Sequence, residues 1–119
     1  MQRYMLRSKI HRATLTGTDL DYEGSIAIDR LLIDAADMLP GEQVHVLNVN
    51  SGARLITYII EAPAGSGTML LNGPAARLGM PGDKVVVLTY GTYSEEEARS
   101  VKPIVVRVDG QNRQLAKPH

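Results

Sequence analysis

The stretch Leu39-Pro40-Gly41-Glu42-Gln43-Val44-His45-Val46 returns later in the chain as Met80-Pro81-Gly82-Asp83-Lys84-Val85-Val86-Val87. In both copies a Pro-Gly-acid turn follows a short helical pattern and opens a strand-like run. Two units of helix, turn and strand indicate a barrel with approximate two-fold symmetry. The alternative is a coincidence between two similar helix-to-strand turns, because Pro-Gly is common in turns. A closed barrel would remove the exposed strand edges that so β-rich a chain would otherwise present.

Most of the remaining sequence also has the pattern of strands. Runs rich in β-branched residues lie at 4–16, 44–49, 55–60, 85–90 and 103–108, and turns are predicted at 50–52 and 65–67. One helix is predicted from an N-cap at Asp29 to a stop at Pro40-Gly41. A second covers 74–78, and a third starts at Ser94, which forms a capping box with Glu97. We expect a mainly β domain with a few short helices and a loosely held polar tail at 110–119.

The composition excludes several classes of protein. The 119 residues suit one domain, and 44% hydrophobic residues suit a folded core. Thirteen basic and thirteen acidic residues, with tyrosines as the only aromatic residues, disfavour nucleic-acid binding. The lack of cysteine excludes disulfides and thiolate zinc sites. No apolar run is long enough for a membrane helix or a signal peptide, so we expect a cytoplasmic protein that binds no membrane.

The pair Gly24-Ser25 allows unusual chemistry, although a Gly-Ser pair is most often a turn, as we expect at Gly65-Ser66. If the fold strains such a bond, the serine hydroxyl can attack the preceding carbonyl and convert the amide to an ester. Elimination and loss of ammonia then leave a pyruvoyl ketone in place of the serine. Glycine leaves the carbonyl open to attack and tolerates strained backbone angles.

Two pairs of polar residues are predicted to share strand faces, because side chains alternate along a strand. Arg54 and Tyr58 could bind a carboxylate and deliver a proton, while Lys9 and His11 form a second polar face. Arg54 can hold a carboxylate with two parallel bonds, whereas Lys9 acts as a point charge. Two cations in one pocket would select a dicarboxylic amino acid. The alternative for both pairs is an ordinary solvated strand face.

Several motifs together, in order from about residue 5 to 108, resemble the pyruvoyl-dependent aspartate 1-decarboxylases. They are Lys9-Ile10-His11-Arg12-Ala13, Asp19-Leu20, Tyr22-Glu23-Gly24-Ser25, Ile28-Asp29, Asp34-Ala35-Ala36, Gly52-Ala53-Arg54, Thr57-Tyr58, Gly65-Ser66-Gly67, Asn72-Gly73, Pro81-Gly82-Asp83 and Glu96-Glu97-Ala98-Arg99. The resemblance implies a double-psi β-barrel and a homotetramer with active sites at subunit interfaces. It also implies cleavage into 1–24 and 25–119, either spontaneous or assisted by a maturation factor.

The activity implied by the resemblance is the conversion of L-aspartate to β-alanine and CO2 for pantothenate biosynthesis. The cofactor would be a pyruvoyl group made from Ser25, which forms a Schiff base with the substrate amine; neither a metal nor pyridoxal phosphate is implied. Tyr58 would be the proton donor. Thr57 and Asn72 would polarise the Gly24 carbonyl during cleavage. The substrate-binding residues would be Lys9, His11, Arg54, Thr57, Gly73, Pro74 and Ala75.

Thr57 falls on the face opposite Tyr58 by alternation, so we expect a local bulge or a role across an interface. Asp21 and Pro74 depart from the family pattern, in which His and Ala are usual, and Pro74 can offer no amide to a substrate. These two departures favour the competing interpretation, an uncleaved barrel that acts as a ligand-binding or assembly module. His11, His45 and His119 have no metal-ligand spacing, so we predict no metal site.

Overall fold

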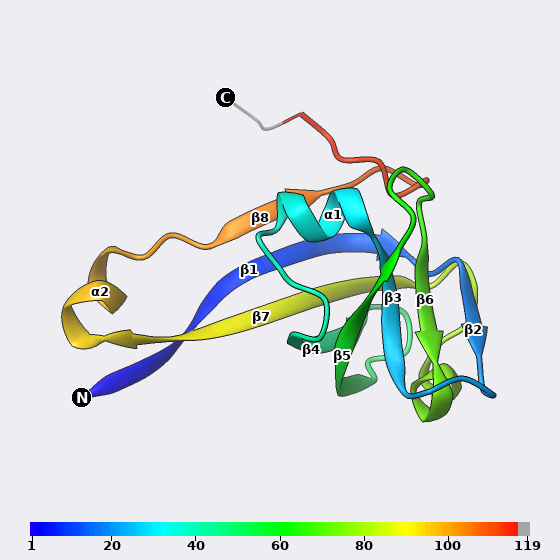
Figure 1. The fold of residues 1–119 in the computed structure, drawn as a ribbon, viewed down its shortest axis with the longest axis horizontal. Coiled ribbons are helices and arrows are strands. Elements are labelled where there is room, and N and C mark those ends of the chain that lie inside the picture. Colours follow the sequence, from blue (N-terminus) through cyan, green and yellow to red (C-terminus); the bar gives the residue numbers. More distant parts are fainter. Residues whose placement is uncertain (117–119) are drawn as a thin grey trace.

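The computed structural model describes residues 1–116 and shows a mainly β protein with one mixed sheet (Figure 1). The strands are β1 (Gln2–Thr14), β2 (Gly17–Asp19), β3 (Ser25–Asp29), β4 (Gln43–Asn48), β5 (Arg54–Ala62), β6 (Met69–Asn72), β7 (Lys84–Ser94) and β8 (Ile104–Arg107). They are hydrogen-bonded in the order β2-β6-β3-β5-β4-β7-β1-β8. The helices are α1 (Arg30–Ala35), the 3-10 helix η1 (Gly73–Leu78) and α2 (Glu95–Ser100). The mainly β prediction is therefore confirmed.

The sheet curls back on itself, because β1 and β2 are consecutive in the chain but lie near opposite ends of the strand order. Only Leu15 and Thr16 separate these strands. The Thr16 amide donates a hydrogen bond of 2.8 Å to the Met69 carbonyl, and β2 then pairs in parallel with β6. The N-terminal stretch thus contacts both halves of the sheet, as closure of a barrel requires. The closed barrel and its double-psi topology stay predictions.

The two Pro-Gly turns of the sequence repeat have the same geometry. Gly41 and Gly82 both adopt a positive φ, at 87° and 94°. In each turn the acidic side chain accepts a hydrogen bond from the amide three residues before it, which joins Leu39 to Glu42 at 3.0 Å and Met80 to Asp83 at 3.1 Å. The repeat in the sequence is therefore a repeat in the structure.

Each of these turns also bonds the backbone of a buried residue from another segment, Ile59 in β5 or Leu15 between β1 and β2. The Gly41 amide donates to the Ile59 carbonyl at 2.7 Å, and the Ile59 amide donates to the Glu42 carbonyl at 3.1 Å. The second turn holds Leu15 in the same way, through the Gly82 amide and the Asp83 carbonyl, with both bonds at 2.8 Å. Ile59 and Leu15 are each 1% exposed. The turns thus fasten β5 and the segment that follows β1 to the core, to which both Ile59 and Leu15 belong.

The core lies inside the curled sheet and is aliphatic. Its most completely buried side chains are Ile10, Leu15, Ile26, Ile28, Leu32, Ile33, Ile59, Met69, Leu71, Val44, Val46 and Val85. They come from both halves of the repeat and from β1, β3, β5 and β6. Because β3 is buried along its whole length, its first residue is held rigidly against the core.

Helix α1 ends well before the predicted stop at Pro40-Gly41. Asp37 adopts a left-handed φ of 55°, and its amide donates to the Asp34 carbonyl at 3.1 Å. The Met38 amide donates to the Ile33 carbonyl at 2.9 Å, which completes a Schellman termination. Met38 then enters the core at 2% exposure. The burial of Met38, which the local pattern does not reveal, sets the end of the helix.

The tail is partly anchored, so its prediction as loosely held was wrong for the residues near Asn112. Asn112 is 2% exposed and donates from its side chain to the carbonyls of Thr14 and Gly67, both at 2.8 Å. Its side-chain oxygen accepts the Thr14 amide at 2.7 Å. The neighbouring Arg113 donates to the Gly65 carbonyl at 2.8 Å. Residues 117–119, and with them His119, lie outside the described residues.

An arm extends from the body of the protein. It is formed by the start of β1, the end of β7 and α2, and the N-terminus lies at its tip (Figure 1). Helix α2 has the predicted capping box between Ser94 and Glu97. The arm exposes Tyr4, whose side chain is 83% accessible to solvent. Within the described residues, no helix is long and apolar enough to cross a membrane.

Candidate active site

Ser25 is the first residue of β3 and is fully buried. Its hydroxyl donates a hydrogen bond of 3.0 Å to the Glu23 carbonyl and accepts one of 3.0 Å from the side-chain amide of Asn72. Asn72 is the last residue of β6, is 3% exposed, and stands directly opposite Ser25 in the antiparallel β3–β6 pair. The sheet register therefore fixes this contact. Asn72 was expected to polarise the Gly24 carbonyl, but in the uncleaved chain its side-chain amide donates to the Ser25 hydroxyl instead.

Gly73 holds the segment before Ser25 at very close range. A Cβ at position 73 would lie 2.7 Å from the backbone nitrogen and Cα of Gly24 and 2.9 Å from the Tyr22 carbonyl oxygen. Gly73 also has a φ of +65°, which side chains rarely adopt. By contrast, Gly24 does not have a positive φ, and a Cβ there would meet only Pro74 at 3.5 Å. The conformation that requires glycine is therefore at Gly73, and not at Gly24 as expected.

A hollow lies beside the Gly24-Ser25 bond. It is lined by Gly24, Leu55, Ile56, Thr57, Tyr58, Pro74, Ala75 and Leu78. Strand β5 pairs with β3 only from Ile59 onward, so the hollow lies against the edge of 55–58. Thr57 and Tyr58 thus reach the same hollow as Gly24, together with Pro74 and Ala75 at the start of η1.

The expected bulge at Thr57 is not found. β5 pairs with β4 in an unbroken register from Tyr58 opposite Gln43 to Arg54 opposite Leu47. Thr57 reaches the hollow because β5 has an open edge there, and no irregularity is needed. The sequence could not show this edge, because it arises where β5 exchanges one partner strand for another.

Tyr58 contacts Glu23, for which the sequence predicts no role. Its hydroxyl donates to the Glu23 carboxylate at 3.4 Å. Partial burial raises the pKa of Tyr58, and the nearby Glu23 carboxylate raises it further. The signal available in the sequence was the position of Glu23, an acid two residues before Ser25 within the quoted motif.

The predicted cationic residues do not line the hollow beside Ser25. Lys9 and His11 lie on β1, which is separated from β3 in the sheet by β7, β4 and β5. They do share a face, since both are partly exposed while Ile10 between them is buried. Arg54 lines a different hollow, with His45, Leu47, Leu55 and Ile56. A single chain therefore holds the serine and the tyrosine together but keeps the cations apart from them.

His11 is in a strongly positive environment. Its ring nitrogen Nδ1 is buried and has no hydrogen-bond partner among the described residues. Burial lowers the pKa of His11, and the charges of Lys9, Arg107 and Arg12 lower it further. Three cations around one imidazole leave this face suited to an anion.

Comparison with known proteins decides the family. A protein-family model described as aspartate decarboxylase matches residues 1–115. The chain belongs to the aspartate decarboxylase family. Within this family, the chain is 60% identical to an aspartate 1-decarboxylase of Dehalococcoides mccartyi, over 92% of this chain and 88% of the relative. It is 59% identical to an aspartate 1-decarboxylase 1 of Gloeobacter violaceus, over 98% of both chains. The family and enzyme class predicted from the motifs are confirmed.

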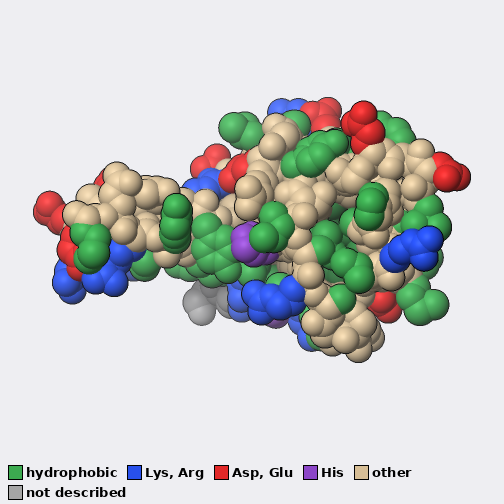
Figure 2. Space-filling model, turned by 90° about the horizontal axis from the view of Figure 1, so that it is seen from below, with side chains coloured by type: hydrophobic (Ala, Val, Ile, Leu, Met, Phe, Trp, Pro, Cys, Tyr) green, Lys and Arg blue, Asp and Glu red, His purple; other side chains and the backbone are tan. Residues whose placement is uncertain are grey.

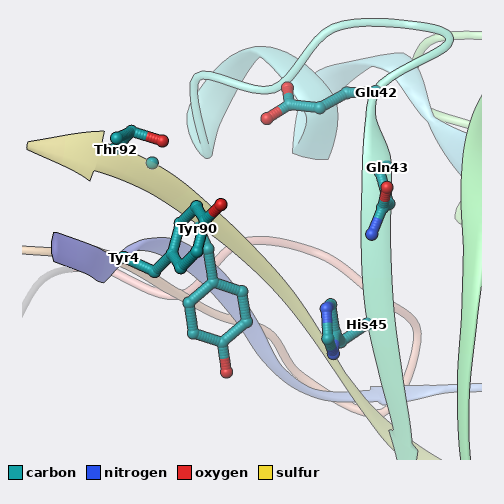
Figure 3. A pocket seen from close by; sticks show the side chains of 7 residues that line it. Tyr4, Glu42, Gln43, His45, Tyr90 and Thr92 are labelled. Atoms are coloured by element: carbon teal, nitrogen blue, oxygen red, sulfur yellow. The ribbon is translucent and has the colours of Figure 1, made fainter. Parts of the chain in front are cut away.

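A further hollow, which Ser25 does not line, measures about 620 Å³ and is lined by Tyr4, Glu42, Gln43, His45, Tyr90, Gly91 and Thr92 (Figure 3). The rings of His45 and Tyr90 meet there edge to face, with centroids 5.0 Å apart. Within residues 1–116, no three His, Asp or Glu residues are grouped so that they could hold a metal.

Proposed function

We propose that the chain cleaves itself between Gly24 and Ser25 and then decarboxylates L-aspartate to β-alanine and CO2. The observation that carries the proposal is the buried Ser25 hydroxyl, fixed by Asn72 and the Glu23 carbonyl. A buried serine at the start of a strand, next to a glycine held by Gly73, supplies both an oriented nucleophile and an accessible carbonyl. Membership of the aspartate decarboxylase family supports the substrate.

The proposed cleavage needs only atoms of this chain and one water molecule. The Ser25 oxygen attacks the Gly24 carbonyl carbon, the C–N bond breaks, and the Ser25 nitrogen takes up the hydroxyl proton to leave an ester. Loss of the Ser25 α-proton expels the Gly24 carboxylate and leaves a dehydroalanine. Water then replaces the nitrogen, which departs as ammonia, and a pyruvoyl group remains at the start of 25–119. Asn72 holds the attacking oxygen, and Thr57 lines the hollow beside Gly24, where its hydroxyl can stabilise the developing oxyanion.

The residues around Ser25 fit a pyruvoyl group. A ketone at position 25 keeps an oxygen acceptor for the Asn72 amide, which would otherwise be buried without a partner. Such a group supplies an electrophilic ketone that binds an amine and withdraws electrons when the carboxylate leaves. Tyr58, in the same hollow as Gly24, delivers a proton to the α-carbon in place of the departed CO2. No metal and no pyridoxal phosphate takes part.

The substrate acid groups require residues that one chain does not bring to Ser25. Lys9, His11 and Arg54 supply the positive charge for a dicarboxylate, and η1 offers the backbone of Gly73, Pro74 and Ala75 beside the hollow. We place the cations of one subunit at the hollow of its neighbour in a homotetramer. This arrangement would complete each site and would select aspartate over a neutral amino acid.

Exposed apolar side chains support association between copies. Tyr4 is 83% exposed, Ile56 61% and Tyr90 42%. Figure 2 shows hydrophobic side chains on the underside of both the arm and the body. Covering such side chains stabilises an assembly. We further propose that the enzyme is cytoplasmic, supplies β-alanine for pantothenate biosynthesis, and matures either alone or with a helper protein.

The substitution Ser25→Ala tests this function. It should abolish both cleavage and the release of CO2 from L-aspartate, while the thermal unfolding of the protein stays close to that of the uncleaved chain. Retained decarboxylation would overturn the mechanism. A wild-type chain that stays uncut and inactive, even after heating or incubation with cell extract, would instead favour the ligand-binding barrel suggested by Asp21 and Pro74.

A further inference from the structure

Glu23 contacts both residues to which the proposed function assigns chemistry. Its main-chain carbonyl accepts the Ser25 hydroxyl at 3.0 Å, and its carboxylate accepts the Tyr58 hydroxyl at 3.4 Å. One residue therefore connects the nucleophile of the cleavage step with the proton donor of the later reaction. The second bond is long for an O–H···O contact, so a modest displacement of Glu23 would break it.

The position of Glu23 depends on the bond that is to be cut. Glu23 is exposed and lies between β2 and β3, outside the ladder hydrogen bonds of the sheet. On its C-terminal side it is held through Gly24 to Ser25, which is buried at the start of β3. Cleavage at Gly24-Ser25 would make Glu23 the penultimate residue of a chain end, and ends are mobile unless they are tied down.

The negative charge created by cleavage would also favour movement of Glu23 away from Tyr58. During maturation the Gly24 carbonyl becomes a carboxylate, directly adjacent to the Glu23 side chain. Like charges so close together repel each other, and an incoming dicarboxylic substrate adds two more. Withdrawal of residues 23–24 would relieve this repulsion and would open the hollow that Gly24 now lines.

We propose that Glu23 is a positioning residue that holds the Tyr58 hydroxyl in the uncleaved chain and releases it when the chain is cut. This inference rests on the proposed function, in which Tyr58 acts only after cleavage. A tyrosine hydroxyl whose proton points at a carboxylate is not free to protonate a substrate carbon. Loss of the carboxylate both frees that proton and makes the hydroxyl a better acid, since a nearby negative charge disfavours its ionisation.

The titration of Tyr58 in the uncleaved protein tests the contact. The titration is made in the Ser25→Ala variant, which cannot cleave. The signal of Tyr58 is the part of the tyrosinate absorbance that disappears when Tyr58→Phe is added. Adding Glu23→Gln should lower the pKa of Tyr58, because the neutral amide no longer repels the phenolate. Adding Asp21→Asn is the matched control, since Asp21 lies in the same exposed segment without a contact to Tyr58, and it should cause no shift. An unchanged pKa in Glu23→Gln would overturn the contact.

The same titration in cleaved protein tests the release. After cleavage, the wild type and Glu23→Gln should show the same Tyr58 pKa. A difference as large as in the uncleaved protein would mean that Glu23 stays in place and would overturn the release. A Glu23→Gln chain that fails to cleave would also overturn the release, because Glu23 would then take part in the cleavage step. If the wild type never cleaves, the proposed function and the release both fail, but the shift in the uncleaved background still shows the contact.

Discussion

The hydroxyl of Ser25 lies 3.0 Å from the side-chain nitrogen of Asn72, and the two residues are directly opposed in neighbouring antiparallel strands. Both side chains are almost completely buried. The contact is therefore shielded from solvent and set by the strand register, and a change at Asn72 acts on that geometry.

Replacing Asn72 with alanine should slow cleavage strongly. The substitution removes the donor that holds the Ser25 oxygen, and loss of one such preorganised donor costs on the order of 100-fold in rate. The fraction of cut chain, followed over time by mass spectrometry, measures the effect. Asn48→Ala is a suitable control, because Asn48 is equally buried but bonds Leu78 and Asp83 instead. Equal slowing in both variants would make the effect one of stability alone.

Replacing Gly73 with alanine should also impair cleavage, because the new methyl group would displace Gly24. Gly82→Ala isolates this contact from the cost of the backbone conformation. Gly82 has a φ of +94°, but a Cβ there meets nothing within 4 Å. In each variant the left-handed residue should cost about 1 kcal/mol of stability. Only the Gly73→Ala chain should cleave slowly. Denaturant unfolding and the cleavage rate separate the two effects, and slow cleavage in both would contradict this account.

Replacing Tyr58 with phenylalanine should leave cleavage intact and reduce turnover. The ring still fills the hollow, but the proton donor is lost, which for general acid catalysis costs about 100-fold or more. Release of CO2 per cleaved site is the measurement. Turnover at the wild-type rate would show that another group delivers the proton.

The acid stability of the fold should depend on Asp29. Burial alone would raise the pKa of this carboxyl, but hydrogen bonds from the amides of Gly67, Leu31 and Gly65 outweigh burial, and the pKa is lowered. Because the folded protein releases this proton more readily than the unfolded chain, the contribution of Asp29 is complete above its ordinary pKa of about 3.9. It is lost as the pH falls through the lowered value.

The substitution Asp29→Asn measures this contribution. The variant should be less stable than the wild type at neutral pH, and the difference in unfolding free energy should shrink as the pH falls below about 4. Urea titrations at several pH values provide the comparison. A difference that stays constant with pH would show that the charge of Asp29 contributes nothing.

The sequence predicted those features that depend on local patterns. The Pro-Gly-acid repeat, the Ser94 capping box and the short helix after Asn72 are all present, because turn and cap residues act on their immediate neighbours. The end of α1 and the anchoring of Asn112 were missed, since both depend on burial against distant segments.

The candidate site was also predicted only in part. The alternation rule placed Lys9 with His11 correctly, but it could not show that Thr57 reaches the hollow from an open strand edge. It also gave no role to Glu23, whose contact with Tyr58 depends on the path of the chain between β2 and β3. Motif resemblance identified the family, while only the fold shows which residues a single chain brings together.

The most direct test of the central claim is the intact mass of the purified protein under denaturing conditions. The account predicts two fragments divided after Gly24, with the larger lacking the Ser25 amine and carrying a ketone. Ser25→Ala should give one uncut chain. A wild-type sample that decarboxylates aspartate but shows a single chain of full mass would contradict the account, because the activity would then arise without the pyruvoyl group.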